Sequence, residues 1–452
     1  MSRRRTARLL ALAALLPFVG RALAHGGSLG GGAGRSLDVP TWLFLATGGG
    51  VVGVSFLLSS FATDREFLAR VHERRRELDV PVGDALVAAA RVVGVLAVAG
   101  VVAAGFLGPA APLRNAAVLV VWVGWWAGLA MAAYLVGNAW PALNPWRTMA
   151  RRLPSLDRPV PVDGAWLSTA GLLALVWMEV VSPLADDPRL LAAVVVGYTA
   201  LALGGYVLFG ARYFETVDPV SRVFRSYGMV APTERGSDGL RLRLPGSGLE
   251  TDSLDGRGDV AFVVALLWGT TFDGLVGTPP WADFARAVVD AGVPAALLYP
   301  AALLAGFAVF YAAYLLAVRY GAGHAETRLD ESVLARRFAP SLLAIAAGYH
   351  LAHYLGYFLS LSPALLGALA DPLSPGQAYT LVLPGWLGGA SLAAVLVGHV
   401  LAVWVAHAVA YDLFPSRMQA VRSQYALTLV MVFYTMTSLW IVSRPYAAPP
   451  FV

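Results

Sequence analysis

The sequence contains no cysteine and no lysine, and all 33 of its Lys and Arg residues are arginine. Without cysteine, the chain can form no disulfide, thiolate metal site, iron–sulfur cluster or covalently attached c-type haem. Without lysine, Schiff-base chemistry is excluded. Any metal that the protein binds must therefore take histidine, carboxylate or water ligands.

Charge is also scarce. Charged residues make up 13% of the 452 residues and hydrophobic residues 58%, and the mean hydropathy is +0.65. A soluble domain carries about a quarter of charged residues, so this composition predicts an integral membrane protein in contact with a lipid bilayer. The formal net charge of +5 is then a signal of membrane topology, and nothing in it indicates nucleic-acid binding.

The apolar segments predict an all-α fold, a polytopic membrane helix bundle of about ten transmembrane helices within residues 41–443. Each segment is near the ~20 residues that a helix needs to cross a bilayer. The expected spans are 42–61, 85–106, 116–136, 165–181, 190–209, 260–276, 295–318, 341–361, 387–410 and 427–442.

The N-terminus is typical of an export signal. Several arginines precede an apolar run over 9–19 and the sequence Ala22-Leu23-Ala24, which predicts a cleavable signal peptide over 1–24. The alternative is an uncleaved short anchor. Residues 25–40 are Gly-rich and predict a flexible tether, and residues 444–452 form a short tail.

The arginine distribution predicts the orientation. The loops after the first, third, fifth, seventh and ninth spans hold most of the arginines, whereas the other side holds only Arg35, Arg114, Arg189, Arg286 and Arg444. By the positive-inside rule, both mature termini lie outside the plasma membrane. The long cytoplasmic loop over 213–259 contains an alternation of leucine and arginine over 240–244, which predicts a short strand or an interfacial segment.

Four histidines lie inside apolar segments: His350 and His353 in the eighth span, His399 and His407 in the ninth. An ionisable side chain in hydrocarbon is costly and usually marks a cavity or pathway. Helical spacing places each pair on one face of its helix, so we expect His350, His353 and His399 to converge near the middle of the bilayer. The alternative is that they are structural hydrogen bonds between packed helices.

Carboxylates lie near this region. Asp273 falls in the run Gly269–Gly274, which we expect to interrupt the sixth helix, and it either caps a helix end or lines a cavity. Glu179, near the outer end of the fourth helix, is a possible accessory residue. His25, the first residue after cleavage, offers an α-amine and an imidazole suited to copper.

Another irregular stretch follows the third span. Residues 138–147 contain two prolines and two asparagines. They predict either a re-entrant turn that lines a cavity or, as we favour, a capped cytoplasmic turn with tryptophans at the interface.

Several chemistries suit such a cluster. Three protein ligands and an open position would make a catalytic site for a divalent metal ion, zinc or copper. Two histidines on facing helices could instead bind a b-type haem, which would give a Soret band. Without metal, the same groups could relay protons or bind substrate in a transporter.

Five segments and the signal junction resemble the multi-spanning membrane proteins known as fenitrothion hydrolases. These are Gly269-Thr270-Thr271-Phe272-Asp273-Gly274, Asn144-Pro145-Trp146-Arg147-Thr148, His353-Tyr354, Gly398-His399-Val400 with Ala406-His407, Arg422-Ser423-Gln424-Tyr425, and Ala24-His25-Gly26. The resemblance covers most of the chain. It implies hydrolysis of an organophosphate triester and singles out Asp273, His353, His399 and His407.

Two functions follow from these observations. The first is a metal-dependent hydrolase of apolar phosphotriester-like molecules that enter from the lipid, with Asp273 as a metal ligand or general base. The second is a transporter of a metal ion, such as copper, or of a small solute. The sequence has no convincing internal repeat, which weighs mildly against alternating access.

Overall fold

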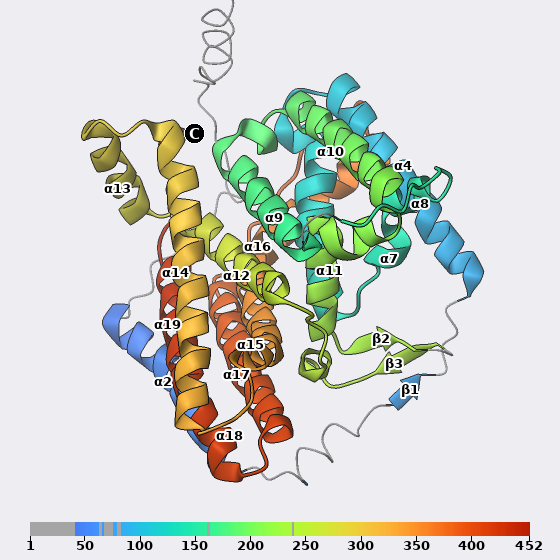
Figure 1. Ribbon diagram of the computed structural model, residues 1–452. Helices are drawn as coiled ribbons and strands as arrows, with labels where there is room; N and C mark the ends of the chain where they lie inside the picture. Colours follow the sequence, from blue (N-terminus) through green and yellow to red (C-terminus); the bar gives the residue numbers. More distant parts are fainter. Residues whose placement is uncertain (1–40, 63–65, 67–75, 79–82, 161–162, 237–238) are drawn as a thin grey trace, which may run out of the picture.

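The computed structural model describes residues 41–62, 66, 76–78, 83–160, 163–236 and 239–452 (Figure 1). The predicted signal peptide, the tether and His25 lie outside the described residues.

The described chain is mostly helical, and its apolar helices fit the predicted multi-pass membrane architecture. Nine of its segments are long and apolar enough to cross a bilayer: Asp84–Leu107 (α4), Ala116–Leu135 (α5, η3 and α6), Gly164–Val181 (α9), Pro188–Phe209 (α10), Arg257–Val276 (α12), Ala295–His324 (α14), Glu331–Ala370 (α15 and α16), Leu387–Leu413 (α17) and Arg417–Val442 (α18 and α19). Helix α2, Thr41–Ala62, is apolar over Leu45–Phe61. Each of the ten expected spans thus coincides with a helix.

Two helices form the centre of the bundle, α12 and α16 (Leu342–Ala370). Most of α12 is buried, whereas little of α4 and α10 is buried, and both expose the apolar side chains expected of helices that face lipid. On one side of the centre, α2 packs with α17 and α19 (Tyr425–Val442); on the other, α4 packs with α10 (Figure 1). Any site between α12 and α16 is therefore deep in the protein.

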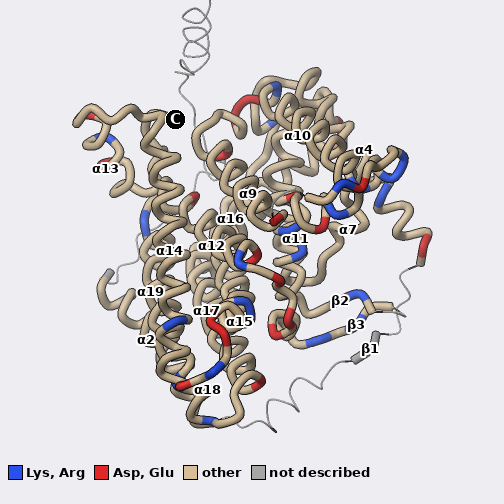
Figure 2. The backbone as a smooth tube through the Cα atoms, viewed as in Figure 1, with Lys and Arg blue, Asp and Glu red and all other residues tan. Residues whose placement is uncertain are grey.

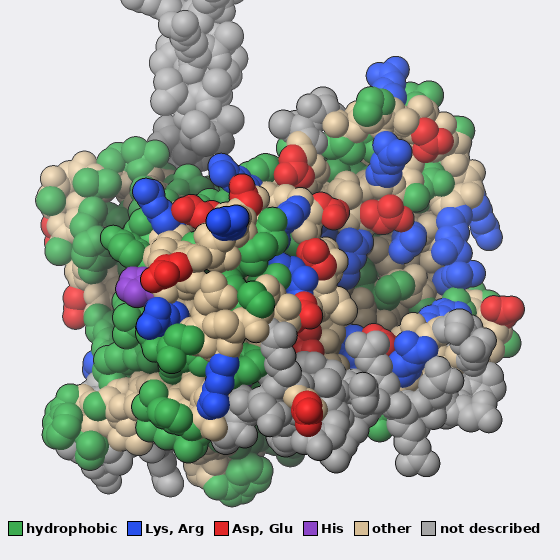
Figure 3. Space-filling view, turned by 60° about the horizontal axis from the view of Figure 1, so that its bottom comes forward, with side chains coloured by type: hydrophobic (Ala, Val, Ile, Leu, Met, Phe, Trp, Pro, Cys, Tyr) green, Lys and Arg blue, Asp and Glu red, His purple; other side chains and the backbone are tan. Residues whose placement is uncertain are grey.

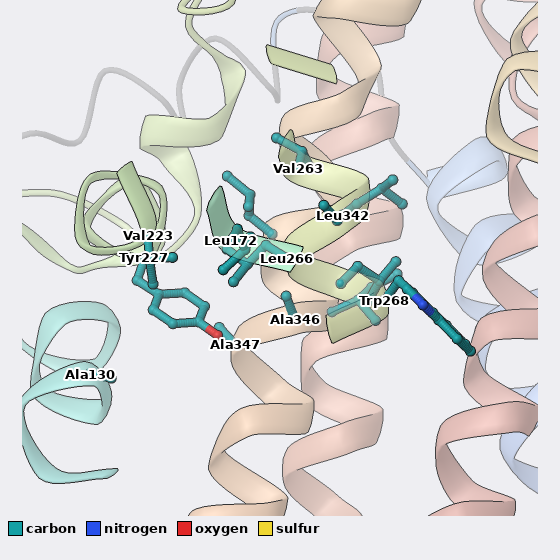
Figure 4. Close-up of a cluster of buried hydrophobic side chains, with 14 of the residues drawn as sticks. Ala130, Leu172, Val223, Tyr227, Val263, Leu266, Trp268, Leu342, Ala346 and Ala347 are labelled. Carbon is teal, nitrogen blue, oxygen red and sulfur yellow. The ribbon is translucent and has the colours of Figure 1, made fainter. Parts of the chain in front are cut away.

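The core around this centre consists of apolar side chains from several helices. Figure 4 shows Leu172 of α9 and Leu266 of α12 close to Ala346 of α16. Tyr227 comes from α11, Pro219–Val230, and is fully buried. Small residues on α16 allow these neighbours to approach its backbone closely.

The seam between α16 and α17 is tighter still. A Cβ atom at Gly348 would lie 2.6 Å from the carbonyl oxygen of Ala394, and one at Gly398 would lie 2.6 Å from that of Ala344. Such contacts are shorter than a side chain allows. Glycine at both positions therefore sets the distance between the two helices.

Arginines gather mostly in loops and at helix ends (Figure 2). In the long loop, Arg222 of α11 pairs with Asp259 at the start of α12, with 2.5 Å between Nη2 and Oδ1. The predicted strand is confirmed as β3, Leu240–Leu242, which lies between β1 (Arg76–Leu78) and β2 (Thr233–Arg235) in an antiparallel sheet.

One expectation was wrong, and another was confirmed in part. Helix α12 runs without interruption through Gly269–Gly274, and the hydroxyls of Thr270 and Thr271 find their acceptors within it, at carbonyls one turn earlier. The turn after the third span is capped, since the Asn144 side chain accepts from the Arg147 amide between α7 (Trp140–Leu143) and α8 (Pro145–Ala150). Its tryptophans, however, are buried and are not interfacial anchors.

The remaining helices connect these elements. They are η2 (Pro112–Arg114), η4 (Pro183–Ala185), η5 (Tyr213–Val217), η6 (Ser247–Glu250), α13 (Pro279–Asp290), α15 (Glu331–Phe338), η7 (Ala339–Ser341) and α18 (Arg417–Ser423). The C-terminal tail is also anchored, because the Tyr299 hydroxyl donates to the carbonyl of Pro450 at 2.7 Å and the Ala447 amide to that of Gly277 at 2.8 Å.

Candidate functional site

The structure brings Asp273 of α12 against two neighbouring residues of α16. The Nε2 atom of His353 lies 3.3 Å from Oδ2 of Asp273, and the Tyr354 hydroxyl donates to the same oxygen at 3.1 Å. The side chain of Asp273 is 11% exposed and that of His353 is 28% exposed. An imidazole that is held by a carboxylate and remains accessible is suited to accepting and releasing protons.

Tyr354 connects this pair to two further residues. Its hydroxyl accepts a hydrogen bond from the indole Nε1 of Trp126 at 3.0 Å. The carboxylate of Glu179, on α9, lies beside the Tyr354 hydroxyl and interacts electrostatically with Asp273. One oxygen of Glu179, Oε1, is buried without a hydrogen-bond partner. Buried polar atoms are normally paired, so this oxygen keeps the capacity to accept a hydrogen bond from a water molecule or a ligand.

Glu179 lines an apolar cavity of about 440 Å³. The cavity lies between η3, α9, α10 and α4, and its wall includes Trp122, Trp125, Trp126, Trp140 and Trp146. Of the described residues that line it, Glu179 alone carries a charge. A largely apolar pocket with one well-placed polar group is the usual form of a small-molecule site.

The cavity wall owes its shape to an unusual helix. Residues Leu119–Leu129 form a π-helix, η3, in the middle of the span Ala116–Leu135. Such wide turns are rare and occur frequently at functional sites. Three tryptophans and two glycines fall in this segment, and a Cβ at Gly128 would lie 2.8 Å from the Phe358 ring of α16. The glycine brings η3 against α16, next to Tyr354.

The Asn-Pro-Trp segment lies at the other end of the cavity. Asn144 donates to Ser221, whose hydroxyl donates to the buried carboxylate of Asp218, and Tyr198 donates to Asp218 as well. Burial raises the pKa of Asp218, and hydrogen bonds from Ser221 and Tyr198 oppose this shift. Trp146 donates from Nε1 to Thr199 at 2.9 Å. These bonds fix the wall formed by Trp146 and Tyr198.

His350 lies against the ring of Tyr354. Its ring centroid is 4.6 Å from that of Tyr354, and its Nδ1 lies 3.0 Å from the Tyr134 hydroxyl. The rings of Trp126 and Tyr227 complete an aromatic enclosure around it. His350 is fully buried, so its arrangement is typical of a structural histidine.

The histidines of α17 are not in this cluster. His399 is fully buried beside the α16–α17 seam, and its Nδ1 lies 2.8 Å from the carbonyl oxygen of Val395 on its own helix. His407 lies 3.3 Å, through Nδ1, from Oε1 of Gln424 and packs against Tyr411. The expected convergence of three imidazoles is therefore replaced by one imidazole, His353, with two carboxylates and a tyrosine.

These positions bear on the expected metal ion. Asp273 and His353 are in contact, whereas His350 and His399 are each bonded through Nδ1, to Tyr134 and to the carbonyl of Val395, with Nε2 of both left without a partner. Within the described ranges, no group of three or more His, Asp or Glu side chains is arranged to hold a metal ion. The expected three-ligand site is therefore not assembled among these residues in this arrangement, and the zinc or copper ion stays a prediction.

Two features of the site were not foreseen. Glu179 was expected only as an accessory, although it is the carboxylate that reaches the cavity, and Trp126 was not considered. The sequence Trp122-Val123-Gly124-Trp125-Trp126 carried a signal, because three indoles in five residues are more than interfacial anchoring of one span requires.

Comparison with known proteins adds no name to this geometry. No family model, curated protein or solved structure matches the chain. The resemblance to fenitrothion hydrolases therefore stays a prediction that rests on the motifs alone.

Proposed function

We propose that this protein is an intramembrane hydrolase of neutral aromatic esters, with phosphotriester-like molecules as the substrate class. The observation that carries the proposal is the tryptophan-lined cavity of about 440 Å³, whose one carboxylate has an unpaired oxygen. Apolar walls favour an uncharged aromatic substrate that partitions into the bilayer. The carboxylate supplies a proton acceptor inside an otherwise unreactive pocket.

The reaction assigns Glu179 the role of general base. A water molecule gives a proton to the Glu179 carboxylate while its oxygen forms a bond to the phosphorus atom. The bond from phosphorus to the aryloxy oxygen breaks, and the departing aryloxide takes that proton from Glu179 and leaves as a phenol. The phosphodiester product is an acid, so one net proton is released for each neutral ester hydrolysed.

That proton needs a way out of a site walled by hydrocarbon. The Tyr354 hydroxyl, Asp273 and His353 form a connected series, with 3.1 Å from Tyr354 to Asp273 and 3.3 Å from Asp273 to His353. His353 is the most exposed member, which suits it to release the proton. In this scheme Tyr354, Asp273 and His353 act as a relay behind the residue that meets the substrate.

The proposal includes the orientation of the chain in the membrane. The arginine-rich loops face the cytoplasm, the signal peptide directs the chain to the plasma membrane, and both mature termini lie outside. A bound zinc or copper ion would polarise the phosphoryl oxygen and lower the pKa of a bound water. Metal analysis of the purified protein tests that prediction.

The direct test is hydrolysis by purified protein in lipid nanodiscs. A dialkyl 4-nitrophenyl phosphotriester releases nitrophenolate, which is measured by its absorbance. We expect turnover by the wild type and a loss of about 10- to 100-fold in Asp273→Asn and His353→Gln, because each breaks the relay. Asp290→Asn, an exposed acid at the end of α13, is the matched control. Absence of nitrophenolate, or equal rates in all four proteins, would overturn the proposal.

A second function uses the same observation. A cavity with one carboxylate connected to a proton relay also suits a transporter that exchanges protons for an apolar solute. In sealed proteoliposomes, a transporter would accumulate an intact aromatic probe when a pH gradient is imposed. A hydrolase would instead release phenol whether or not the gradient is present.

A further inference from the structure

A second hollow lies far along the chain from the proposed site, at the arginine-rich end of α14. It is a groove of about 740 Å³ between the last turns of α14 and the junction of α18 and α19. Two arginines line it, Arg319 from α14 and Arg422 from α18. Figure 3 turns this end of the molecule forward and shows arginine, acidic, histidine and hydrophobic side chains close together on this face.

Close packing of two helices brings the arginines to one groove. A Cβ at Gly321 would lie 2.3 Å from the carbonyl oxygen of Ser423, so glycine is required where α14 meets the end of α18. Arg319 precedes this contact by two residues on α14, and Arg422 precedes Ser423 directly. The groove is thus a built feature of the fold and not a chance approach of two long side chains.

Both guanidinium groups are available. Arg319 and Arg422 are exposed, and neither has a salt bridge or a side-chain hydrogen bond to any residue that the structure describes. Glu326 is the one acidic residue in the groove wall, so the described lining has an excess of one positive charge when His324 is neutral. Nδ1 of His324 lies 2.7 Å from the carbonyl oxygen of Tyr320.

The apolar part of the groove has the chemistry of a membrane interface. Leu316 is 51% exposed, Tyr320 60% and Tyr425 43%. Tyrosines with one apolar face and one polar tip are enriched at the level of lipid headgroups. Arginine recognises phosphate through two parallel N–H donors, and it does so best where water is partly excluded.

We propose that this groove binds the phosphate of an anionic phospholipid, with Arg319 and Arg422 on the phosphate oxygens and Leu316, Tyr320 and Tyr425 against the glycerol and upper acyl chains. The charge excess favours a headgroup such as glycerol over one such as choline, whose cation the two arginines repel. This site shares no residue with the cavity of Glu179. Its success or failure is therefore independent of the hydrolase proposal.

Native mass spectrometry of the full chain, released from detergent, tests the proposal. The protein is titrated separately with phosphatidylglycerol and phosphatidylcholine, and a third titration repeats phosphatidylglycerol with inorganic phosphate as competitor. We expect saturable binding of phosphatidylglycerol that Arg319→Gln combined with Arg422→Gln weakens about 30-fold, as expected for two arginines near a phosphate. Arg328→Gln, an exposed arginine outside the groove, is the control for charge removal.

Each alternative outcome contradicts the proposal in its own way. Equal binding of the two lipids would show that the groove does not select negative charge. Displacement of the lipid by millimolar phosphate would indicate a site for the free anion. Unchanged binding in the double variant would place the lipid elsewhere. Arg319→Lys combined with Arg422→Lys keeps the charge without the paired donors, and partial recovery of binding in this variant would separate loss of phosphate recognition from loss of folding.

Discussion

Two sides of α16 differ in how closely they are packed. Towards α17, glycines at Gly348 and Gly398 bring the backbones together and leave His399 enclosed. Towards η3 and α9, a π-helix and several indoles leave a cavity that one carboxylate of α9, Glu179, reaches. Both sides contain an unpaired polar atom, Nε2 of His399 on the first and Oε1 of Glu179 on the second.

The comparison shows that an unpaired atom indicates function only where there is space beside it. His399 lines neither this cavity nor the groove between α14 and α18, and its unpaired Nε2 is a cost that the tight packing of the seam offsets. The side chain of Glu179, in contrast, lines a volume large enough for a drug-sized molecule. Depth in the membrane does not distinguish His399 from Glu179, whereas the free volume beside the side chain does.

Glu179→Gln is expected to have the largest effect on activity. The amide keeps the size of the side chain but cannot take a proton from water, so hydrolysis should fall about 100-fold or more while substrate binding is kept. The measurement is the rate of nitrophenolate release, together with binding of a non-hydrolysable aromatic phosphonate. Glu331→Gln, an exposed glutamate at the start of α15, is the control. A rate within twofold of the wild type would remove Glu179 from the mechanism.

The seam is tested by adding one methyl group. A Cβ at Gly348 would meet backbone atoms of α17 at 2.6 and 2.9 Å, which cannot move aside as a flexible side chain can. We expect Gly348→Ala to destabilise the protein by about 1–3 kcal/mol, measured by thermal unfolding in detergent.

Gly367→Ala is the matched control on the same helix. No atom lies within 4 Å of a Cβ at Gly367, so the change should be neutral or stabilise the helix by up to about 1 kcal/mol. Equal effects of the two substitutions would show that α16 and α17 are not as close as the structure has them.

Much of the fold could be predicted from the sequence, because each membrane span is a run of about twenty mostly apolar residues. Whether a polar residue faces a cavity is decided by contacts between segments far apart in sequence. Asp273 and His353 were expected together and are in contact. His399 was expected with them, but its Nδ1 is paired with a carbonyl one turn away on its own helix, which spacing along the chain does not reveal.

The π-helix is a second example. Its register changes the direction of Trp122, Trp125 and Trp126 relative to an α-helix, and no local sequence rule predicted that change. Even so, Gly128 opposite Phe358 gives a physical reason for the close approach of η3 to α16. The three tryptophans of this span indicate a ligand site, and the number of spans alone does not reveal it.

Trp126→Phe tests the link between cavity and relay. Phenylalanine keeps an aromatic wall but removes the indole N–H that donates to Tyr354, so we expect the hydrolysis rate to fall about fivefold. Trp122→Phe is the matched control, since Trp122 lines the same cavity and its Nε1 has no hydrogen-bond partner among the described residues. If both changes slow the reaction equally, cavity shape matters and the hydrogen bond to Tyr354 does not.

His399→Gln should have the smallest effect on hydrolysis. It tests whether the side of α16 that faces α17 takes part in the reaction. Because His399 is enclosed and bonded to its own helix, we expect hydrolysis within about twofold of the wild type, whereas the same substitution at His353 breaks the relay. Activity and metal content are measured on both variants in parallel. A loss of activity together with a loss of bound metal in His399→Gln would mean that α16 and α17 separate to let His399 and His353 share a metal ion. In that case the tight seam is one state of a site that opens, and free volume in a single state is not a sufficient guide to function.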